Sequence, residues 1–216
     1  CTGQELALRN PNVLYNLSDM GAGKTLMTVQ AIYILNYQRY LQTKDILTNV
    51  KNIKLADVSL IAPTLSIKSS WLDTFKIFYD INKIDDNTYE LSTTIDGHKL
   101  ISTLNVAGFT ARANAITITS TLPRKIDKSF LIIDEIHQLA MRKLSARKFF
   151  AKGVVPAENY QSFILSGTLS DLTTNQWYNL IHFLGLNLTI NHDEITNMTP
   201  QYCEDRLESH NNKIIN

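Results

Sequence analysis

The sequence predicts an α/β fold with a mainly parallel central sheet that is covered by helices on both faces. Short apolar runs typical of buried strands alternate along the chain with segments of helical periodicity, and this order is typical of parallel sheets. A glycine-rich segment separates one such run from the helix after it, and an Asp-Glu pair directly follows another. The chain of 216 residues is long enough to bury one substantial core or two small ones.

The first half of the chain begins with two strand–helix pairs. The apolar run 13–17 predicts a short buried strand, and the helical spacing of apolar residues that follows predicts a helix from 24 to about 42. A polar stretch over 43–57 is expected to link this helix to a second strand at 58–62. That strand should stop at Pro63, which cannot donate to a sheet ladder. A second helix is expected over 65–79.

We expect a strand over 89–95, a turn at Asp96-Gly97 and a helix that begins at His98. The alternating residues 116–119 predict a further strand.

The second half again alternates between strands and helices. The continuous apolar run 130–133 is typical of a central parallel strand. A basic helix is expected over 139–152, a strand over 163–165 and a helix over 173–184. The tail after 187 is polar and should add little to the core.

Composition excludes several classes of protein. A net charge of +1 does not indicate a nucleic-acid partner by bulk charge alone. The two cysteines, Cys1 and Cys203, form no disulfide framework and no metal-binding spacing, so a reducing intracellular setting is expected. The longest apolar stretch in the first half, 26–35, is too short to span a bilayer. Because the chain begins at Cys1 without a leader, we expect it to be a fragment of a longer protein.

The heptad 19–25, Asp-Met-Gly-Ala-Gly-Lys-Thr, has the composition of a phosphate-binding loop. Gly21 and Gly23 allow a tight turn that aims backbone N–H groups at phosphate oxygens. Lys24 can reach the β- and γ-phosphates, and the Thr25 hydroxyl can hold Mg²⁺. The strand before the loop and the helix after it are the context that this chemistry needs, because a helix N-terminus attracts anions.

The acidic pair Asp134-Glu135 follows the apolar run 130–133, at the carboxyl end of a predicted strand. Ligands of open α/β sheets bind at that edge. Asp134 can hold Mg²⁺, usually through a water molecule, and Glu135 can orient and deprotonate an attacking water molecule. A solvated turn is the alternative interpretation of the pair taken alone.

Several segments, in order along the chain, resemble the motifs of the first RecA-like lobe of superfamily 2 helicases and translocases. The heptad differs by one residue from the Asp-Met-Gly-Leu-Gly-Lys-Thr of the Snf-type DNA translocases, which this chain resembles most. Asp-Glu-Ile-His at 134–137 has the Asp-Glu-x-His (DEAH-like) form of the second motif. Other similarities cover motif Ia at 62–65 with Trp71, motif Ib at 118–120, motif III at 165–168, and a helix after motif III at 171–185.

The resemblance implies a three-layer αβα RecA-like P-loop domain over residues 1–185. The polar segment 186–216 would then lead to a second lobe that this chain lacks. Two departures from the motifs are Ser18, in the place of the first glycine of the loop, and Leu169, in the place of a proline after motif III.

The resemblance also implies a role for each matched residue. The ATP-binding residues would be Gln4, Met20, Gly21, Ala22, Gly23, Lys24 and Thr25. Mg²⁺ would be held by Thr25 and Asp134, and the catalytic residues would be Lys24, Asp134 and Glu135. Coupling of the nucleotide state to DNA would fall to His137, Ser166, Gly167 and Thr168. The DNA backbone would contact Pro63, Thr64, Thr119 and Ser120.

Other conspicuous residues have plainer interpretations. The aromatic residues at helical spacing are expected in the core rather than as platforms for base stacking: Trp71, Phe75, Phe78 and Trp177. The basic cluster within 142–152 is expected to be a solvated helix face.

The implied function is that of the ATP-binding lobe of a DNA-dependent ATPase, a Snf-like duplex translocase or a helicase. ATP and Mg²⁺ are the expected cofactors, and duplex DNA is favoured over single strands as the partner. A bacterial or phage member acting in the cytoplasm, with no membrane association, is expected. The second lobe supplies arginine fingers in this superfamily, and such a finger can raise the hydrolysis rate by about 10³- to 10⁵-fold. The isolated chain should therefore bind ATP but hydrolyse it far more slowly than the full-length protein. A viral DNA-packaging type of ATPase and a non-catalytic, nucleotide-gated docking module remain as alternatives.

Overall fold

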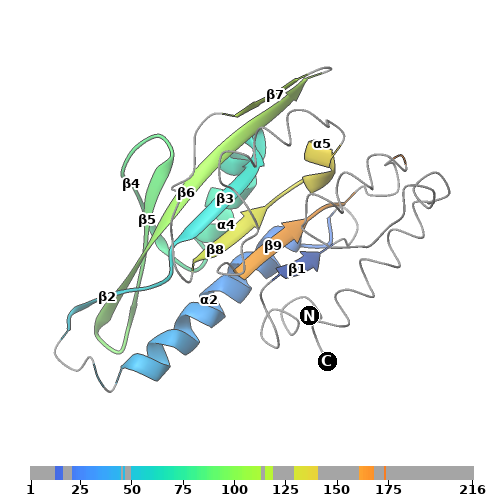
Figure 1. The fold of residues 1–216 in the computed structure, drawn as a ribbon. Helices are drawn as coiled ribbons and strands as arrows, with labels where there is room; N and C mark the ends of the chain where they lie inside the picture. Colours follow the sequence, from blue (N-terminus) through green and yellow to red (C-terminus); the bar gives the residue numbers. More distant parts are fainter. Residues whose placement is uncertain are drawn as a thin grey trace, which may run out of the picture.

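The computed structural model describes residues 13–16, 21–44, 46, 50–112, 115–118, 129–140, 161–167 and 173. These residues form one sheet of nine strands, whose parallel part runs in the order β1-β9-β8-β3-β6. These five strands are β1 (Val13–Asn16), β9 (Gln161–Leu165), β8 (Phe130–Ile133), β3 (Val58–Pro63) and β6 (His98–Arg112) (Figure 1). The predicted α/β fold with a mainly parallel central sheet is confirmed.

Antiparallel strands extend the sheet beyond β6. They are β5 (Thr88–Ile95), which pairs with β6, and β4 (Asp80–Lys83), which pairs with β5. β7 (Ala115–Ile118) is also antiparallel to β6, whereas the short β2 (Asn52–Lys54) is parallel to it. The polar stretch 43–57, expected to be a linker, therefore contains a strand.

The helix expected from His98 is wrong, because β6 occupies that segment. Asp96 and Gly97 have φ angles of 52° and 78°, as the two central residues of a tight hairpin turn require, and they connect β5 to β6. Buried side chains then alternate along β6, at Leu100, Ser102 and Leu104. The polar Ser102 interrupts the apolar alternation that would have indicated a strand, and it is tolerated because its hydroxyl donates to the Ala56 carbonyl at 2.7 Å.

The described helices are one long helix and several short helical segments. α2 (Lys24–Thr43) agrees with the predicted helix 24–42. A continuous helical stretch after β3 comprises α3 (Thr64–Ser66), the π-helix η1 (Ile67–Trp71) and α4 (Leu72–Phe75). It ends at Phe75, before the expected residue 79, because the chain turns there to enter β4. α5 (Ile136–Ala140) follows β8, and the rest of the basic helix 139–152 and the helix 173–184 lie outside the described residues, apart from Thr173.

Both faces of the sheet are buried. On one face α2 and the η1–α4 stretch share a core with the strands, to which Ile32, Trp71 and Phe75 contribute fully buried side chains. The strand residues that point to the opposite face are equally buried: Ile61, Leu131, Ile133 and Ile164. Among the described residues, no helix has the length and apolar character needed to cross a membrane.

The carboxyl ends of four neighbouring parallel strands meet at one edge of the sheet. Ile133 at the end of β8 lies opposite Ile61 of β3 and Ile164 of β9, and Asn16 at the end of β1 lies opposite Leu165. In Figure 1 the arrowheads of β1, β9, β8 and β3 point to the same side of the molecule. The segments that follow these strands, which contain the residues predicted to be functional, are therefore brought to one edge.

Candidate functional site

The glycine loop leads directly into α2 at this edge. Gly21 and Gly23 have φ angles of 83° and 77°, a left-handed conformation that side chains rarely adopt. A Cβ atom at either position would meet nothing within 4 Å, so open space lies beside the loop. Gly23 is the N-cap of α2, and it offers no side chain to compete for the first N–H groups of the helix. The loop and the 20-residue helix after it therefore suit an anion such as a phosphate group.

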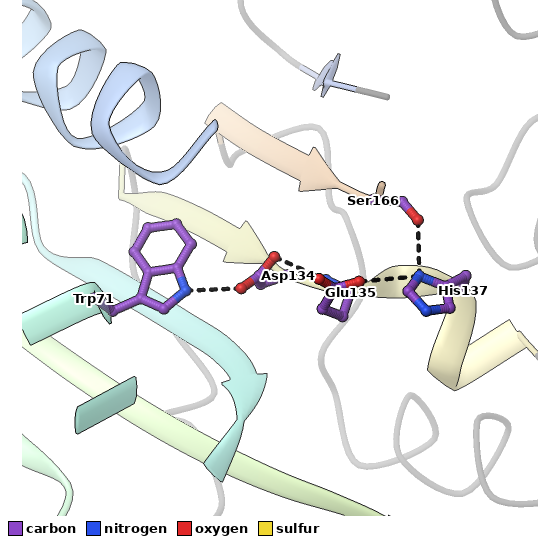
Figure 2. A network of polar contacts seen from close by, with 5 residues as sticks. All are labelled: Trp71, Asp134, Glu135, His137 and Ser166. Atoms are coloured by element: carbon purple, nitrogen blue, oxygen red, sulfur yellow. Dashed lines mark hydrogen bonds and ion pairs between the residues drawn. The ribbon is translucent and has the colours of Figure 1, made fainter. Parts of the chain in front are cut away.

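Asp134 is held in a fixed orientation directly after β8. Its backbone N–H donates to the Ile61 carbonyl at 2.8 Å, which continues the pairing of β8 with β3. Its Oδ1 accepts from the backbone N–H of Glu135 at 2.9 Å, and its Oδ2 accepts from Nε1 of Trp71 at 2.8 Å. Figure 2 shows the indole and the carboxylate facing one another across the edge of the sheet. The Asp134 side chain is buried, and the hydrogen-bond donors on both of its oxygens compensate its charge.

Glu135 has a strained backbone. Its φ angle of 52° lies in the left-handed region, which costs a non-glycine residue about 1–2 kcal/mol. Such strain often marks functional sites, because the surrounding structure must impose it. Here it turns the chain sharply between β8 and α5, so that the neighbouring carboxylates point in different directions (Figure 2).

His137 connects Glu135 to the end of β9. Its Nδ1 lies 3.1 Å from Oε2 of Glu135 and 2.9 Å from Oγ of Ser166. Either Nδ1 or the Ser166 hydroxyl can donate the hydrogen bond between them, depending on the tautomer of His137, and the contact with Glu135 is an ion pair when the imidazole is protonated. Ser166 is fully buried, and its backbone N–H donates to the Asn16 carbonyl at the end of β1 at 3.2 Å. A continuous set of contacts thus extends from Trp71 to Ser166 (Figure 2).

Burial raises the pKa of both carboxyl groups. For Asp134, desolvation is the main cause; the Trp71 hydrogen bond opposes it, and the Glu135 charge adds to it. The pKa of Glu135 is also raised mainly by desolvation, and the Lys24 charge opposes this effect. Lys24 lowers the pKa of both groups, so its ammonium lies within electrostatic reach of both. The structure therefore brings the glycine loop and the acidic pair together, although more than a hundred residues separate them.

A pH-dependent stability follows from the raised pKa of Asp134. A carboxyl that takes up its proton more readily in the folded state stabilises the fold below its unfolded pKa of 3.8, and this contribution is lost as the pH rises through the folded pKa. Relative to Asp134→Asn, the metal-free chain should therefore gain unfolding free energy as the pH falls from about 7 towards that value. Denaturant unfolding of both proteins across this range would measure the difference. Parallel pH profiles would contradict the expectation.

Two of the residues predicted to contact DNA follow β3 at the same edge. Pro63 ends β3 and Thr64 begins the helical stretch after it, and both are partly exposed. The Thr64 hydroxyl donates to the Phe109 carbonyl at 3.2 Å, so only its lone pairs remain for another partner. Their contact with DNA stays a prediction.

Outside the described residues lie Gln4, Met20, Thr119, Ser120 and Thr168. Ala22 is exposed, Thr25 is partly exposed at the first turn of α2, and Gly167 follows Ser166. Within the described part of the chain, no group of three or more His, Cys, Asp and Glu side chains gathers as a metal site would. Mg²⁺ commonly uses only one or two carboxylates together with substrate phosphates, so Asp134 and Thr25 fit this ion.

Trp71 was matched to motif Ia and expected in the core, and its side chain is indeed fully buried. Its hydrogen bond to Asp134 was missed, because the two residues lie 63 positions apart and neither helical periodicity nor strand alternation relates them.

Comparison with protein families gives a match over residues 9–171 to the family described as "Type III restriction enzyme, res subunit". This range covers most of the chain and includes the glycine loop, the acidic pair and Ser166. The chain belongs to this family. Membership in the res-subunit family identifies a helicase-like ATPase domain with a RecA-like P-loop fold, in agreement with the arrangement of the sheet edge.

A solved structure titled "The Phi-28 gp11 DNA packaging Motor" is similar to this member of the res-subunit family at a TM-score of 0.35 and 14% sequence identity. The match covers 90% of this chain and 55% of that one, so the chain spans about half of its length. A TM-score of this size supports no conclusion about fold or function. No curated protein matches the chain.

Proposed function

We propose that this chain is the ATP-binding lobe of a DNA-dependent ATPase, a Snf-like duplex translocase or helicase that couples ATP hydrolysis to movement on DNA. The observation that carries the proposal is the meeting of Lys24 with Asp134 and Glu135 at one sheet edge, where His137 joins Glu135 to Ser166. In this proposal, one site contains the residues for ATP hydrolysis and the His137–Ser166 contact that would transmit the nucleotide state towards the DNA-binding residues.

The glycine loop and the start of α2 hold the phosphates. Backbone N–H groups of the loop would bind the phosphates in the open space beside Gly21 and Gly23, and Lys24 would supply a positive charge to the β- and γ-phosphates. The Thr25 hydroxyl and the Asp134 carboxylate would hold Mg²⁺, which would supply positive charge to the phosphates. Met20 and Ala22 would add backbone contacts, and Gln4 would recognise adenine.

Glu135 orients the attacking water molecule and accepts its proton. Its raised pKa makes it a better proton acceptor than an exposed glutamate. One of its oxygens is held by His137, which leaves the other for water. His137 and Ser166, with Gly167 and Thr168 after it, would transmit the loss of the γ-phosphate to the strand ends that face DNA.

The Snf-like assignment is supported by the heptad 19–25 and by the segment 171–185, which both resemble that group. In this proposal residues 1–185 form the nucleotide-binding domain, and 186–216 lead towards a second RecA-like lobe that supplies arginine fingers. The DNA backbone would contact Pro63, Thr64, Thr119 and Ser120, and these contacts would not read the base sequence.

ATP hydrolysis should be stimulated chiefly by duplex DNA when this chain acts together with a second lobe. The measurement compares hydrolysis without DNA, with single strands and with blunt duplex, and a protein carrying Glu135→Gln is the blank. Stimulation chiefly by single strands would instead indicate a strand-separating helicase. The absence of any response to either form of DNA would contradict the proposal.

A further inference from the structure

We propose that Trp71 is a positioning residue for magnesium: its indole N–H fixes the carboxylate of Asp134 in the orientation that holds the ion. The inference rests on the proposed function, because it assigns Mg²⁺ to Asp134. It is carried by the 2.8 Å hydrogen bond from Nε1 of Trp71 to Oδ2 of Asp134, which connects the segment after β3 to the end of β8.

The two hydrogen bonds on Asp134 determine how its carboxylate can rotate. The Glu135 N–H occupies one lone pair of Oδ1, and the Trp71 N–H occupies one lone pair of Oδ2. Each oxygen keeps one lone pair, whose direction is then set by the two donors. Mg²⁺ demands near-ideal octahedral geometry, so a carboxylate that is already oriented loses less freedom when it holds the ion.

The indole itself is immobilised. Trp71 is fully buried, and its ring lies against that of Phe75, with 6.3 Å between the centroids. It is the last residue of η1, in which the Leu72 N–H bonds to the Ile67 carbonyl across a widened π turn. Such turns are rare in proteins, and those that occur are frequently found at functional sites. A rigid donor of this kind can position the carboxylate, whereas a mobile lysine or water molecule could not.

Satisfaction of a buried indole N–H is the simpler explanation of the contact. A backbone carbonyl would serve that purpose equally well, and it would need no charged side chain to be buried. Here the acceptor is the carboxylate proposed to hold magnesium, at the end of the central strand. The two explanations differ in one measurable property, the magnesium dependence of nucleotide binding.

The first test uses the unaltered chain. It contains two tryptophans, Trp71 and Trp177, and a Trp177→Phe variant assigns the two indole N–H signals in a ¹H–¹⁵N spectrum. The Trp71 signal should move when Asp134 is replaced by asparagine. It should also move when Mg²⁺ is added to the complex with a non-hydrolysable ATP analogue, and Mn²⁺ should broaden it. A Trp71 signal that responds to none of these changes would overturn the inference.

The second test is Trp71→Phe, which keeps an aromatic ring but removes the N–H donor. The Mg²⁺ concentration that half-saturates binding of a fluorescent ATP analogue should rise by about 10- to 100-fold, the usual effect of removing a partner of a metal ligand. Binding of the same analogue in EDTA should not change. In an Asp134→Asn background the substitution should have no further effect on the magnesium dependence.

Phe130→Leu is the control for lost core packing, because Phe130 is fully buried in the same core, at the start of β8, and its ring lies against that of Phe163. It should lower the thermal stability without changing the magnesium dependence. The inference is overturned if Trp71→Phe leaves the magnesium dependence unchanged, or if Phe130→Leu shifts it equally. A wild-type chain that bound no nucleotide would overturn the proposed function as well, so the two failures are distinguishable.

Discussion

Replacement of Glu135 by glutamine should slow ATP hydrolysis by about 10²- to 10⁴-fold while ATP binding is retained, because a positioned general base contributes about this much. Glutamine keeps the size of the side chain and can still contact His137, but it cannot accept a proton from water. The rate is best measured in single-turnover reactions with excess protein and γ-labelled ATP, since the isolated chain should be slow. Binding of a fluorescent analogue measures the affinity in parallel.

Glu90→Gln is the control for this substitution. Glu90 lies on β5, where its carboxylate pairs with Lys99 at 3.1 Å. Its replacement should leave both the rate and the affinity unchanged, since this partly exposed ion pair on β5 and β6 includes no residue of the proposed nucleotide site. A Glu135→Gln chain that hydrolysed ATP at the wild-type rate would remove Glu135 from the mechanism and would leave a non-catalytic docking module as the better description.

Replacement of Lys24 by alanine should weaken ATP binding by about 10- to 150-fold, which corresponds to the 1.5–3 kcal/mol typical of hydrogen bonds to charged groups. The same substitution removes the positive charge that opposes the raised pKa values of Asp134 and Glu135. The affinity can be measured by titration calorimetry with a non-hydrolysable analogue and Mg²⁺.

Lys76→Ala is the control for this loss of charge. Lys76 follows α4 and forms an exposed ion pair with Asp73 at 2.8 Å, so its removal should not affect the affinity. Wild-type affinity in Lys24→Ala would mean that the glycine loop does not hold the phosphates as proposed.

Much of the fold could be predicted because strong local patterns are present. The apolar run of β8 is buried whichever neighbours it has, and the spacing of Val29, Ile32 and Leu35 leaves α2 one face to bury. The hairpin turn at Asp96-Gly97 was also predictable, because both positions need positive φ angles that glycine and aspartate tolerate. Strand β6 was not, since the buried Ser102 depends on a carbonyl 46 residues away.

The candidate site divides in the same way. The glycine loop and the acidic pair were recognisable as short contiguous segments next to predicted strands. The hydrogen bond between Trp71 and Asp134 joins residues 63 positions apart, and that between His137 and Ser166 joins residues 29 apart. Such contacts depend on the order of strands in the sheet, which periodicity does not encode.

The sequence by itself therefore determined the α/β class, the phosphate-binding loop and the acidic pair at a strand end, because each depends on the conformational preferences and burial of neighbouring residues. The tertiary structure alone decided that β1, β9, β8 and β3 are adjacent, that Glu135 is turned into a strained conformation, and that Trp71 reaches Asp134. These features arise from packing between distant segments, where a difference of a few ångströms decides whether a carboxylate finds its donor.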